Sequence, residues 1–176
     1  MLYVQQSLGP DEELVHIGQF HWIYTVKAFL SIFWGMLASI VVILASVLLY
    51  KVLGQLPPGI SWAEAVSSVH PSLRIFSFVV FLLGLLSFAQ MMVVKATTEI
   101  AITNKRMIYK RGLIARNVGE LNVDRIEGVN VLQSVLGRFL NYGRLAIRGM
   151  GVGEVVLPAI EDPIVFRKAI ERAKSL

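Results

Sequence analysis

The amino-acid sequence predicts an α+β membrane protein, in which a hairpin of two transmembrane helices is followed by a small β-rich domain. Two long apolar runs, at residues 28–50 and 75–94, predict the helices because neither contains a charged residue. After Lys95 the period changes, and apolar residues alternate with polar ones as they do in strands. A C-terminal stripe of apolar residues is typical of an amphipathic helix and completes the pattern.

The composition agrees with a membrane protein. Of the 176 residues 55% are hydrophobic and 16% charged, and the mean hydropathy is +0.64, which is more apolar than an ordinary soluble domain. The absence of cysteine excludes disulfides, thiolate metal ligands and cysteine nucleophiles. Residues 95–176 hold 14 Lys or Arg and 8 Asp or Glu, a net charge of +6, which leaves −1 for the first 94 residues.

The N-terminal residues 1–27 are predicted to form a separate cytoplasmic segment. Acidic residues stand at Asp11–Glu13, where a signal peptide would be basic or apolar, so we expect no signal peptide. Residues 10–19 predict a short amphipathic helix that begins at this acidic cluster. His16 and His21 lack further ligands at a suitable spacing, and we interpret them as interfacial polar residues rather than a metal site.

Each apolar run is long enough to cross a bilayer. The runs contain 23 and 20 residues, which at about 1.5 Å per residue span roughly 34 and 30 Å, against a hydrocarbon core of about 30 Å. In the first run Ser31, Gly35 and Ser39 recur at every fourth position and so share one helix face. This face is either a seam for dimerisation or, as we favour, the face on which the second helix packs.

The loop between the runs, residues 51–74, is predicted to lie outside the cell. Ser61 with Glu64 three residues later predicts a capping box for one short helix. The loop has only two basic residues, Lys51 and Arg74, whereas many Lys and Arg follow the second run directly. The positive-inside rule therefore predicts that both termini are cytoplasmic.

Residues 95–176 are predicted to form a cytoplasmic domain of about seven short strands and one terminal helix. A hairpin is expected at residues 97–110, with Asn104 in its turn. Further strand candidates are Leu113–Asn117, Glu120–Val123, Gly128–Gln133, Arg144–Arg148 and Glu154–Leu157. Residues 134–143 predict one or two helical turns, and Asp162-Pro163 predicts the N-cap and first residue of the terminal helix.

Several motifs of this domain resemble the bacterial pleckstrin-homology-like, membrane-flanked domain family. Thr103 and Arg106 match the Thr-x-x-Arg turn that follows its first strand, and Gly112 follows the second strand. Three further pairs match later elements of the family pattern: Gln133-Ser134, Gly137-Arg138 and Tyr142-Gly143. Upstream, Glu12 or Glu13 and His21 are similar to the family's entry into a two-span hairpin.

The resemblance implies a small barrel or sandwich of two orthogonal sheets, capped by the C-terminal helix. It is strongest from residue 97 to 151 and looser over most of the remaining chain. Because only 82 residues follow the second apolar run, we expect short loops and a missing or merged strand. The family has no common enzymatic activity. The resemblance also implies that this chain is located in the bacterial inner (cytoplasmic) membrane.

The sequence contains no set of residues suited to catalysis. All three histidines precede the β-rich domain, and neither a P-loop nor a dinucleotide fingerprint is present. The glycine-rich residues 149–154 lie between two strand candidates and predict a hairpin turn. We therefore expect no enzyme, no cofactor and no metal site.

Basic residues in the first hairpin and directly after it are the candidate binding residues for a lipid or a partner. They are Lys105, Arg106, Lys110, Arg111 and Arg116. Each cation adds about 1 kcal/mol of attraction near an anionic leaflet. The same residues would equally serve to set the topology and to keep the domain soluble.

Three functions remain open from the sequence. The leading hypothesis is a non-enzymatic, membrane-anchored scaffold or adaptor, which presents its domain at the cytoplasmic face to a protein partner or to a second copy of itself. The second is recognition of anionic lipid by the basic hairpin, and the third is an accessory subunit of a membrane transport or export complex. We expect no nucleic-acid binding, because the aromatic platform of single-strand binders is missing.

Overall fold

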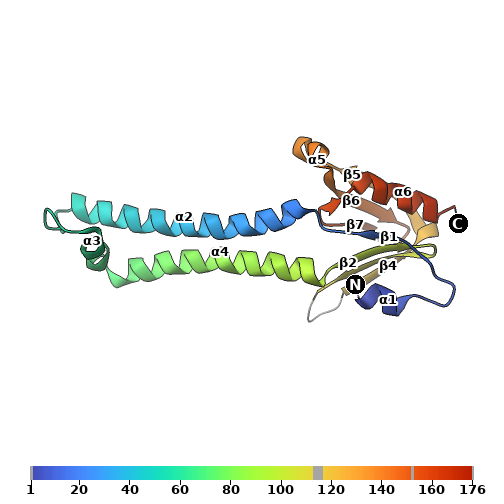
Figure 1. Cartoon of the computed structure of the whole chain (residues 1–176), viewed down its shortest axis with the longest axis horizontal. Helices are drawn as coiled ribbons and strands as arrows, with labels where there is room; N and C mark the ends of the chain where they lie inside the picture. Colours follow the sequence, from blue (N-terminus) through green and yellow to red (C-terminus); the bar gives the residue numbers. More distant parts are fainter. Residues whose placement is uncertain (1, 113–116, 152, 176) are drawn as a thin grey trace. The chain divides into compact units, whose positions relative to one another are not determined.

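The computed structural model describes residues 2–112, 117–151 and 153–175, which fall into two compact units (Figure 1). Met1–Tyr24 and Val93–Leu176 together make a β-rich unit, and Thr25–Met92 make a helical unit. The N-terminal segment thus belongs to the same compact unit as the C-terminal part of the chain.

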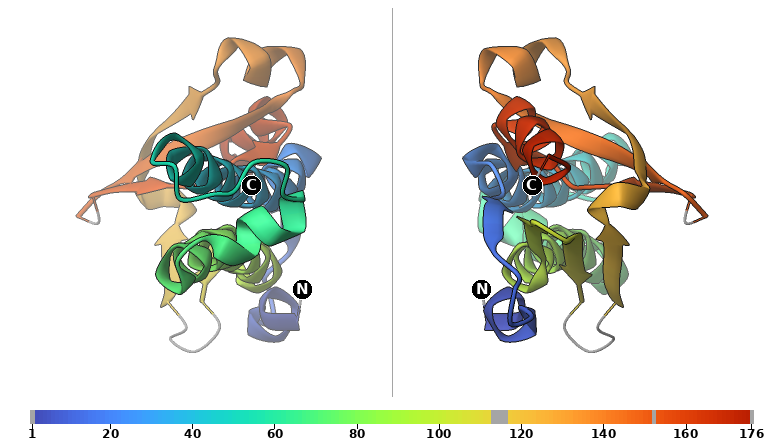
Figure 2. Two further views of the ribbon diagram at one scale, coloured as in Figure 1. Left: turned by 90° about the vertical axis from the view of Figure 1, so that its left-hand side faces the viewer. Right: turned by 90° about the vertical axis from the view of Figure 1, so that its right-hand side faces the viewer.

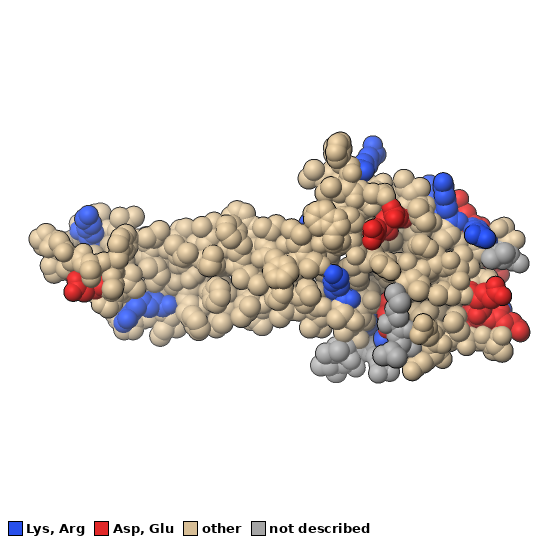
Figure 3. Space-filling view, in the orientation of Figure 1, with Lys and Arg blue, Asp and Glu red and all other residues tan. Residues whose placement is uncertain are grey.

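Two long helices make up most of the helical unit: α2 (Trp22–Val52) and α4 (Pro71–Thr97), joined through the short helix α3 (Trp62–Ser68). Both long helices are apolar and long enough to cross a membrane. Residues 28–50 of α2 and 75–94 of α4 contain no charged residue, and the middle of the helical unit carries no blue or red side chain on the face seen in Figure 3. The predicted capping box is confirmed, because the Ser61 hydroxyl accepts from the Glu64 amide and the Glu64 carboxylate accepts from the Ser61 amide.

Small residues allow α2 and α4 to approach closely. A Cβ added to Gly35 or to Gly84 would lie 2.8 Å from the Cα of the other glycine. The Ser31 hydroxyl lies 3.3 Å from the carbonyl oxygen of Gly84, to which it donates, and the hydroxyls of Ser39 and Ser77 are 2.8 Å apart. The stripe of small residues on the first helix therefore packs against the second helix, which confirms the interpretation that we favoured.

In the described part of the β-rich unit the strands form two four-stranded antiparallel sheets (Figure 2). The first sheet has the order β1 (Leu14–Gly18), β2 (Glu99–Thr103), β3 (Arg106–Arg111), β4 (Asn117–Asn122). The second has the order β5 (Ile126–Leu132), β6 (Tyr142–Gly149), β7 (Gly153–Val156), with β8 (Ile160–Glu161) also paired to β6. The remaining elements are α1 (Leu2–Ser7), the 3₁₀ turn Val123–Arg125, α5 (Val135–Phe139) and the terminal helix α6 (Pro163–Ala173). The arrangement is an open sandwich and confirms the predicted fold class.

Strand β1 corrects the prediction for the N-terminal segment. The helix expected over residues 10–19 is wrong, because Leu14–Gly18 is a strand that pairs antiparallel with β2. In this register Ile17 lies opposite Ala101 and Gly18 opposite Ile100. Backbone hydrogen bonds to β2 outweigh any helical tendency of so short a segment. The domain thus obtains its missing strand from the chain that precedes the helices.

Most other predicted elements that lie within the described residues are confirmed. Glu120–Val123 falls largely within β4, whereas Leu113–Asn117 lies almost wholly outside the described residues. Asp162 is the N-cap residue of α6, as expected, but its φ is 46° and its side chain does not cap the helix. Instead the Asn141 side-chain amide donates a hydrogen bond to the Asp162 carboxylate.

The hydrophobic core lies between the two sheets and α6. Fully buried side chains come from all three layers, among them Ile102 of the first sheet, Ile147 of the second and Ile170 of the helix. Gly18 of β1 meets Phe166 of α6 so closely that an added Cβ would lie 2.9 Å from the ring. Each such aliphatic or aromatic side chain contributes about 1.5–3 kcal/mol on burial, so α6 fixes β1 within the sandwich.

We expect that cysteines at positions 39 and 77 form an intramolecular disulfide in this cysteine-free chain. The two serine hydroxyls are already in contact at 2.8 Å, and a disulfide needs Cβ atoms about 3.5–4.5 Å apart. Adding Gly84→Leu should lower the disulfide yield several-fold, because a Cβ there meets the Ser31 carbonyl oxygen at 2.8 Å. Electrophoresis of the oxidised protein in mild detergent, without reductant, measures the yield.

The control for this experiment pairs Ser39→Cys with Val79→Cys, since the Val79 side chain is 42% exposed on α4. This pair should cross-link poorly within one chain. A Ser39–Ser77 cysteine pair that cross-links equally well with and without Gly84→Leu would contradict the close packing of the helices.

Candidate binding site

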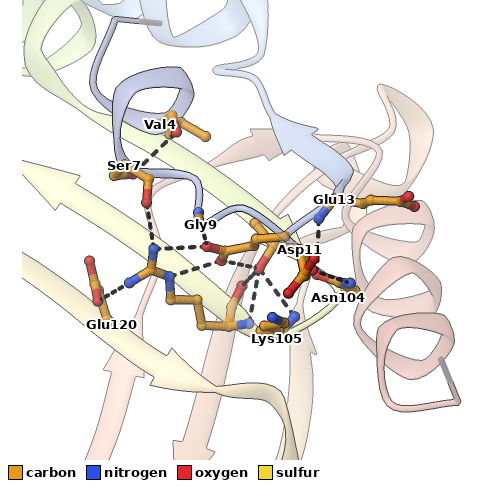
Figure 4. A network of polar contacts seen from close by, with 11 residues as sticks. Val4, Ser7, Gly9, Asp11, Glu13, Asn104, Lys105 and Glu120 are labelled. Carbon is orange, nitrogen blue, oxygen red and sulfur yellow. Dashed lines mark hydrogen bonds and ion pairs between the residues drawn. The ribbon is translucent and has the colours of Figure 1, made fainter.

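A network of ion pairs and hydrogen bonds joins the N-terminal segment to the turn between β2 and β3 (Figure 4). Its centre is Glu12, whose side chain is only 3% exposed. The Glu12 carboxylate accepts hydrogen bonds from Arg106 Nε and Nη2, each at 2.9 Å, and from the Thr103 hydroxyl at 2.7 Å. The Gly9 amide donates a further bond at 3.0 Å. Glu12 is therefore a buried carboxylate whose oxygens are well satisfied.

The same network explains the Thr-x-x-Arg motif. The Thr103 hydroxyl accepts from the backbone amide of Arg106 at 3.0 Å and so closes the turn. The Arg106 guanidinium reaches Glu120 Oε2 at 2.6 Å and the Ser7 carbonyl oxygen at 2.7 Å, in addition to Glu12. Glu12 and Arg106 are 94 residues apart in the sequence, and they meet because β1 pairs with β2.

These contacts shift the pKa values of both partners. Burial raises the pKa of the Glu12 carboxyl, but hydrogen bonds from Arg106, Gly9 and Thr103, together with the charge of Arg106, outweigh it. The pKa falls from 4.5 to about 2. The hydrogen bond to Glu12 likewise raises the pKa of the Arg106 guanidinium, and the pair is fully ionised at neutral pH.

The candidate basic residues are not gathered into one cluster. Arg106 is held by Glu12 and Glu120, and Lys110 pairs with Glu99, with 3.3 Å between Nζ and Oε1. Lys105 and Arg111 are exposed, and at about 3.3 Å per residue they stand roughly 20 Å apart along β3. Arg116 lies outside the described residues. Binding by this set of cations stays a prediction.

A cavity of about 370 Å³ lies against β1 and the start of β2. Its apolar wall is formed by Val4, Leu14, Ile17, Phe20, Ala96 and Ile100, and its polar groups are Gln5, Gln19, Lys95, Thr98 and Glu99. Helix α1 supplies one side, since the Val4 amide donates to Glu99 Oε2 at 3.2 Å. Burial raises the pKa of Glu99, but this bond and the contact with Lys110 outweigh it and lower the pKa.

The Thr98 hydroxyl stands out in this wall. Within the described part of the chain it is a buried side-chain oxygen without a hydrogen-bond partner, in a residue that is 9% exposed. An unmet hydrogen bond of this kind costs about 1–3 kcal/mol. Sequence reasoning missed the cavity, because its walls come from three segments that only the fold brings together.

No metal-binding cluster is found among the described residues. Among them no group of three or more His, Asp or Glu is placed to hold a metal ion. His16 contacts Phe166 edge-on, with 5.6 Å between ring centroids. His21 is only 4% exposed and stacks on Tyr142 at 5.1 Å, which corrects its interpretation as an interfacial polar residue. Glu12 and His21 of the entry motif, and Tyr142 of the Tyr-Gly pair, therefore make contacts that hold the β-rich unit together.

The fold and its motifs define a class: a pleckstrin-homology-like sandwich with a C-terminal helix, joined to a pair of long apolar helices. The chain belongs to the bacterial PH domain family, whose family model matches residues 14–174. The match begins at the first residue of β1 and so includes the strand that precedes the helices. No curated protein and no solved structure matches the chain.

Replacing Glu12 by Gln should lower the free energy of unfolding of the β-rich unit by about 2–3 kcal/mol, because charge-assisted hydrogen bonds are lost and Arg106 keeps fewer partners. Hydrogen exchange of the full chain in detergent should show faster exchange in β1 and in the β2–β3 turn. Glu171→Gln is the matched control, since its pair with Arg167 is more than half exposed on both sides and such pairs contribute little. Equal effects of the two variants would contradict a central role for Glu12.

The network should also make stability depend on pH in the acid range. Because the pKa of folded Glu12 lies below 4.5, its contribution is complete above about pH 4.5 and is lost as the pH falls toward 2. The difference corresponds to ~3 kcal/mol. Thermal melting followed by circular dichroism should show a steeper fall in Tm between pH 5 and 2 for the unmodified chain than for Glu12→Gln. Parallel curves would show that other groups control acid unfolding.

Proposed function

We propose that the protein is a non-enzymatic adaptor anchored in the bacterial inner membrane. In this proposal α2 and α4 span the membrane, and the PH-like domain stands at the cytoplasmic face and binds a segment of a protein partner. The observation that carries the proposal is the cavity beside β1, the edge strand of the first sheet.

The chemistry of the cavity favours a peptide segment over a phosphate group. Its wall is mostly apolar, and Gln5 and Gln19 add neutral donors and acceptors suited to an amide backbone. Among the described residues that line the cavity, Lys95 is the single basic one, whereas phosphate recognition uses clusters of cations. Residues 14, 17 and 18 of β1 line the cavity, and an edge strand can pair with an extended segment whose side chains enter an adjacent pocket.

The distribution of charge supports the cytoplasmic orientation. Residues 51–74 contain two basic residues, Lys51 in the last turn of α2 and Arg74 near the start of α4, whereas 14 Lys or Arg follow from residue 95 onward. The positive-inside rule then favours a cytoplasmic PH-like domain. The two apolar helices, of 31 and 27 residues, support membrane association through their length and apolar composition.

Recognition of anionic lipid by the first hairpin ranks second. The exposed Lys105 and Arg111 favour it, but Arg106 and Lys110 are already held by carboxylates. A transport accessory role ranks third, because the face of small residues on α2 is used within the hairpin by Gly84 and Ser77.

A photoreactive phenylalanine analogue at Gln19, in the cavity wall, should capture a discrete protein partner in intact cells. The same analogue at Lys168, exposed on α6, is the control position and should give no such adduct. Ala96→Trp should abolish the adduct, because a large side chain there fills the cavity, whereas Lys168→Trp should leave it unchanged. The purified partner should bind the full chain at least tenfold more weakly after Ala96→Trp.

Two outcomes would contradict the proposed function. One is equal capture from positions 19 and 168, and the other is an adduct that persists at full yield in the Ala96→Trp variant. Circular dichroism and thermal melting of each variant in detergent verify that the fold is kept.

A further inference from the structure

We propose that α5 is a membrane-binding tip: Val135, Leu136 and Phe139 insert into the interfacial layer of an anionic phospholipid bilayer, and the neighbouring Arg138 binds its headgroups. This inference rests on the proposed function in one respect, namely that the apolar helices hold the domain at a membrane. It assigns a second surface to the domain, separate from the cavity at β1.

The apolar side chains of α5 are almost fully exposed. Phe139 is 91% exposed, Val135 84% and Leu136 68%, and α5 projects beyond the rest of its unit in Figures 1 and 2. Burial of each such side chain would contribute about 1.5–3 kcal/mol. Isolated exposed apolar residues are normal, but three on a helix of five residues mark an interaction surface.

The fold holds this tip in a defined conformation. The Ser134 hydroxyl accepts from the Gly137 amide at 3.1 Å and caps α5. The Gln133 side-chain amide donates to the Tyr142 carbonyl oxygen at 3.1 Å and so joins the two ends of the connection. A Cβ on Gly137 would lie 2.7 Å from that same oxygen. The Gln, Ser and Gly of the Gln-Ser-x-x-Gly motif thus hold the conformation in which the apolar residues of α5 are exposed to solvent.

The charge around the tip complements an anionic surface. Residues 128–153 contain Arg138, Arg144 and Arg148 and no Asp or Glu, and all three arginines are exposed. Cations beside aromatic and aliphatic side chains are typical of segments that lie in the membrane interface. Each cation adds about 1 kcal/mol near anionic lipid.

The base of the tip is tied to the start of the longer apolar helix. Tyr142 follows α5 closely and stacks on the buried His21 at 5.1 Å. The next residue, Trp22, is the first of α2 and is 55% exposed, as is typical of an aromatic residue at a membrane interface. This contact places the base of the tip beside the point where the chain enters α2.

A bilayer is a better occupant than a protein for this surface. Stable protein interfaces bury about 800 Å² from each partner, which three side chains at a protruding tip do not supply. Insertion into lipid needs no complementary surface, and its strength grows with the apolar area buried. Contact with a second copy of the chain is therefore an outcome of the test and not part of the proposal.

The test uses single cysteines, which the cysteine-free chain allows, labelled with a polarity-sensitive fluorophore. Val135→Cys reports the tip, Lys168→Cys on α6 is the aqueous reference, and Leu83→Cys on α4 reports the apolar helices. The labelled full chain is reconstituted in vesicles of phosphatidylcholine with phosphatidylglycerol, with spin-labelled lipids as quenchers. We expect blue-shifted emission at position 135 and strong quenching by shallow spin labels, both weaker in pure phosphatidylcholine.

A second variant keeps the result decisive. Phe139→Ser should lower the ratio of inserted to free tip by about tenfold, the factor that corresponds to 1.4 kcal/mol, and leave the signal at position 168 unchanged. A tip label in water, with position 83 quenched by deep spin labels, would overturn this inference and leave the membrane anchor intact. An unquenched label at position 83 would instead overturn the anchor. A blue shift at position 135 that depends on protein concentration in detergent would overturn the inference in favour of self-association.

Discussion

The pairing of β1 with β2 is the constraint on which the β-rich unit depends. These strands lie on opposite sides of the two long helices in the sequence, so the chain must leave the sheet and return to it. The buried ion pair between Glu12 and Arg106 holds the segment before β1 against the β2–β3 turn. The close contact between Gly18 and Phe166 holds the end of β1 against α6. The chain leaves the first sheet at β1 and returns to it at β2, and these two strands are neighbours in that sheet.

The ion pair between Glu12 and Arg106 contributes to stability because of its buried surroundings and not through its charges alone. Exposed pairs such as Arg167 with Glu171 contribute little, since water screens them. Glu12 is nearly inaccessible to water, and the bonds from Thr103 and Gly9 offset much of the cost of its burial. Such a pair also gives specificity, because a shift of one residue in the turn would leave a buried carboxylate without its partners.

Local features of this fold were predictable from sequence, whereas long-range ones were not. Apolar runs, the capping box at Ser61 and the small-residue stripe on α2 depend on neighbouring residues. Strand β1 depends on a partner 84 residues away, as Ile17 lies opposite Ala101, and its five residues show no decisive period. For the same reason the sequence marked Lys110 as a candidate binding residue but did not reveal that Lys110 forms an ion pair with Glu99. The apolar character of Phe139 alone would predict a buried side chain, but in the structure this side chain is exposed.

The cavity and the tip of the β-rich unit both involve the short segment of residues 20–22. The cavity includes Lys95 and Ala96, which belong to the last turns of α4, and Phe20, which directly precedes the buried His21. The tip reaches the same short segment through the stacking of Tyr142 on His21. A partner in the cavity and a bilayer at the tip would thus act on residues 20–22 from two sides. If lipid contact at α5 and partner binding at β1 each favoured a different conformation of residues 20–22, the two binding events would be coupled, with His21 as their common neighbour.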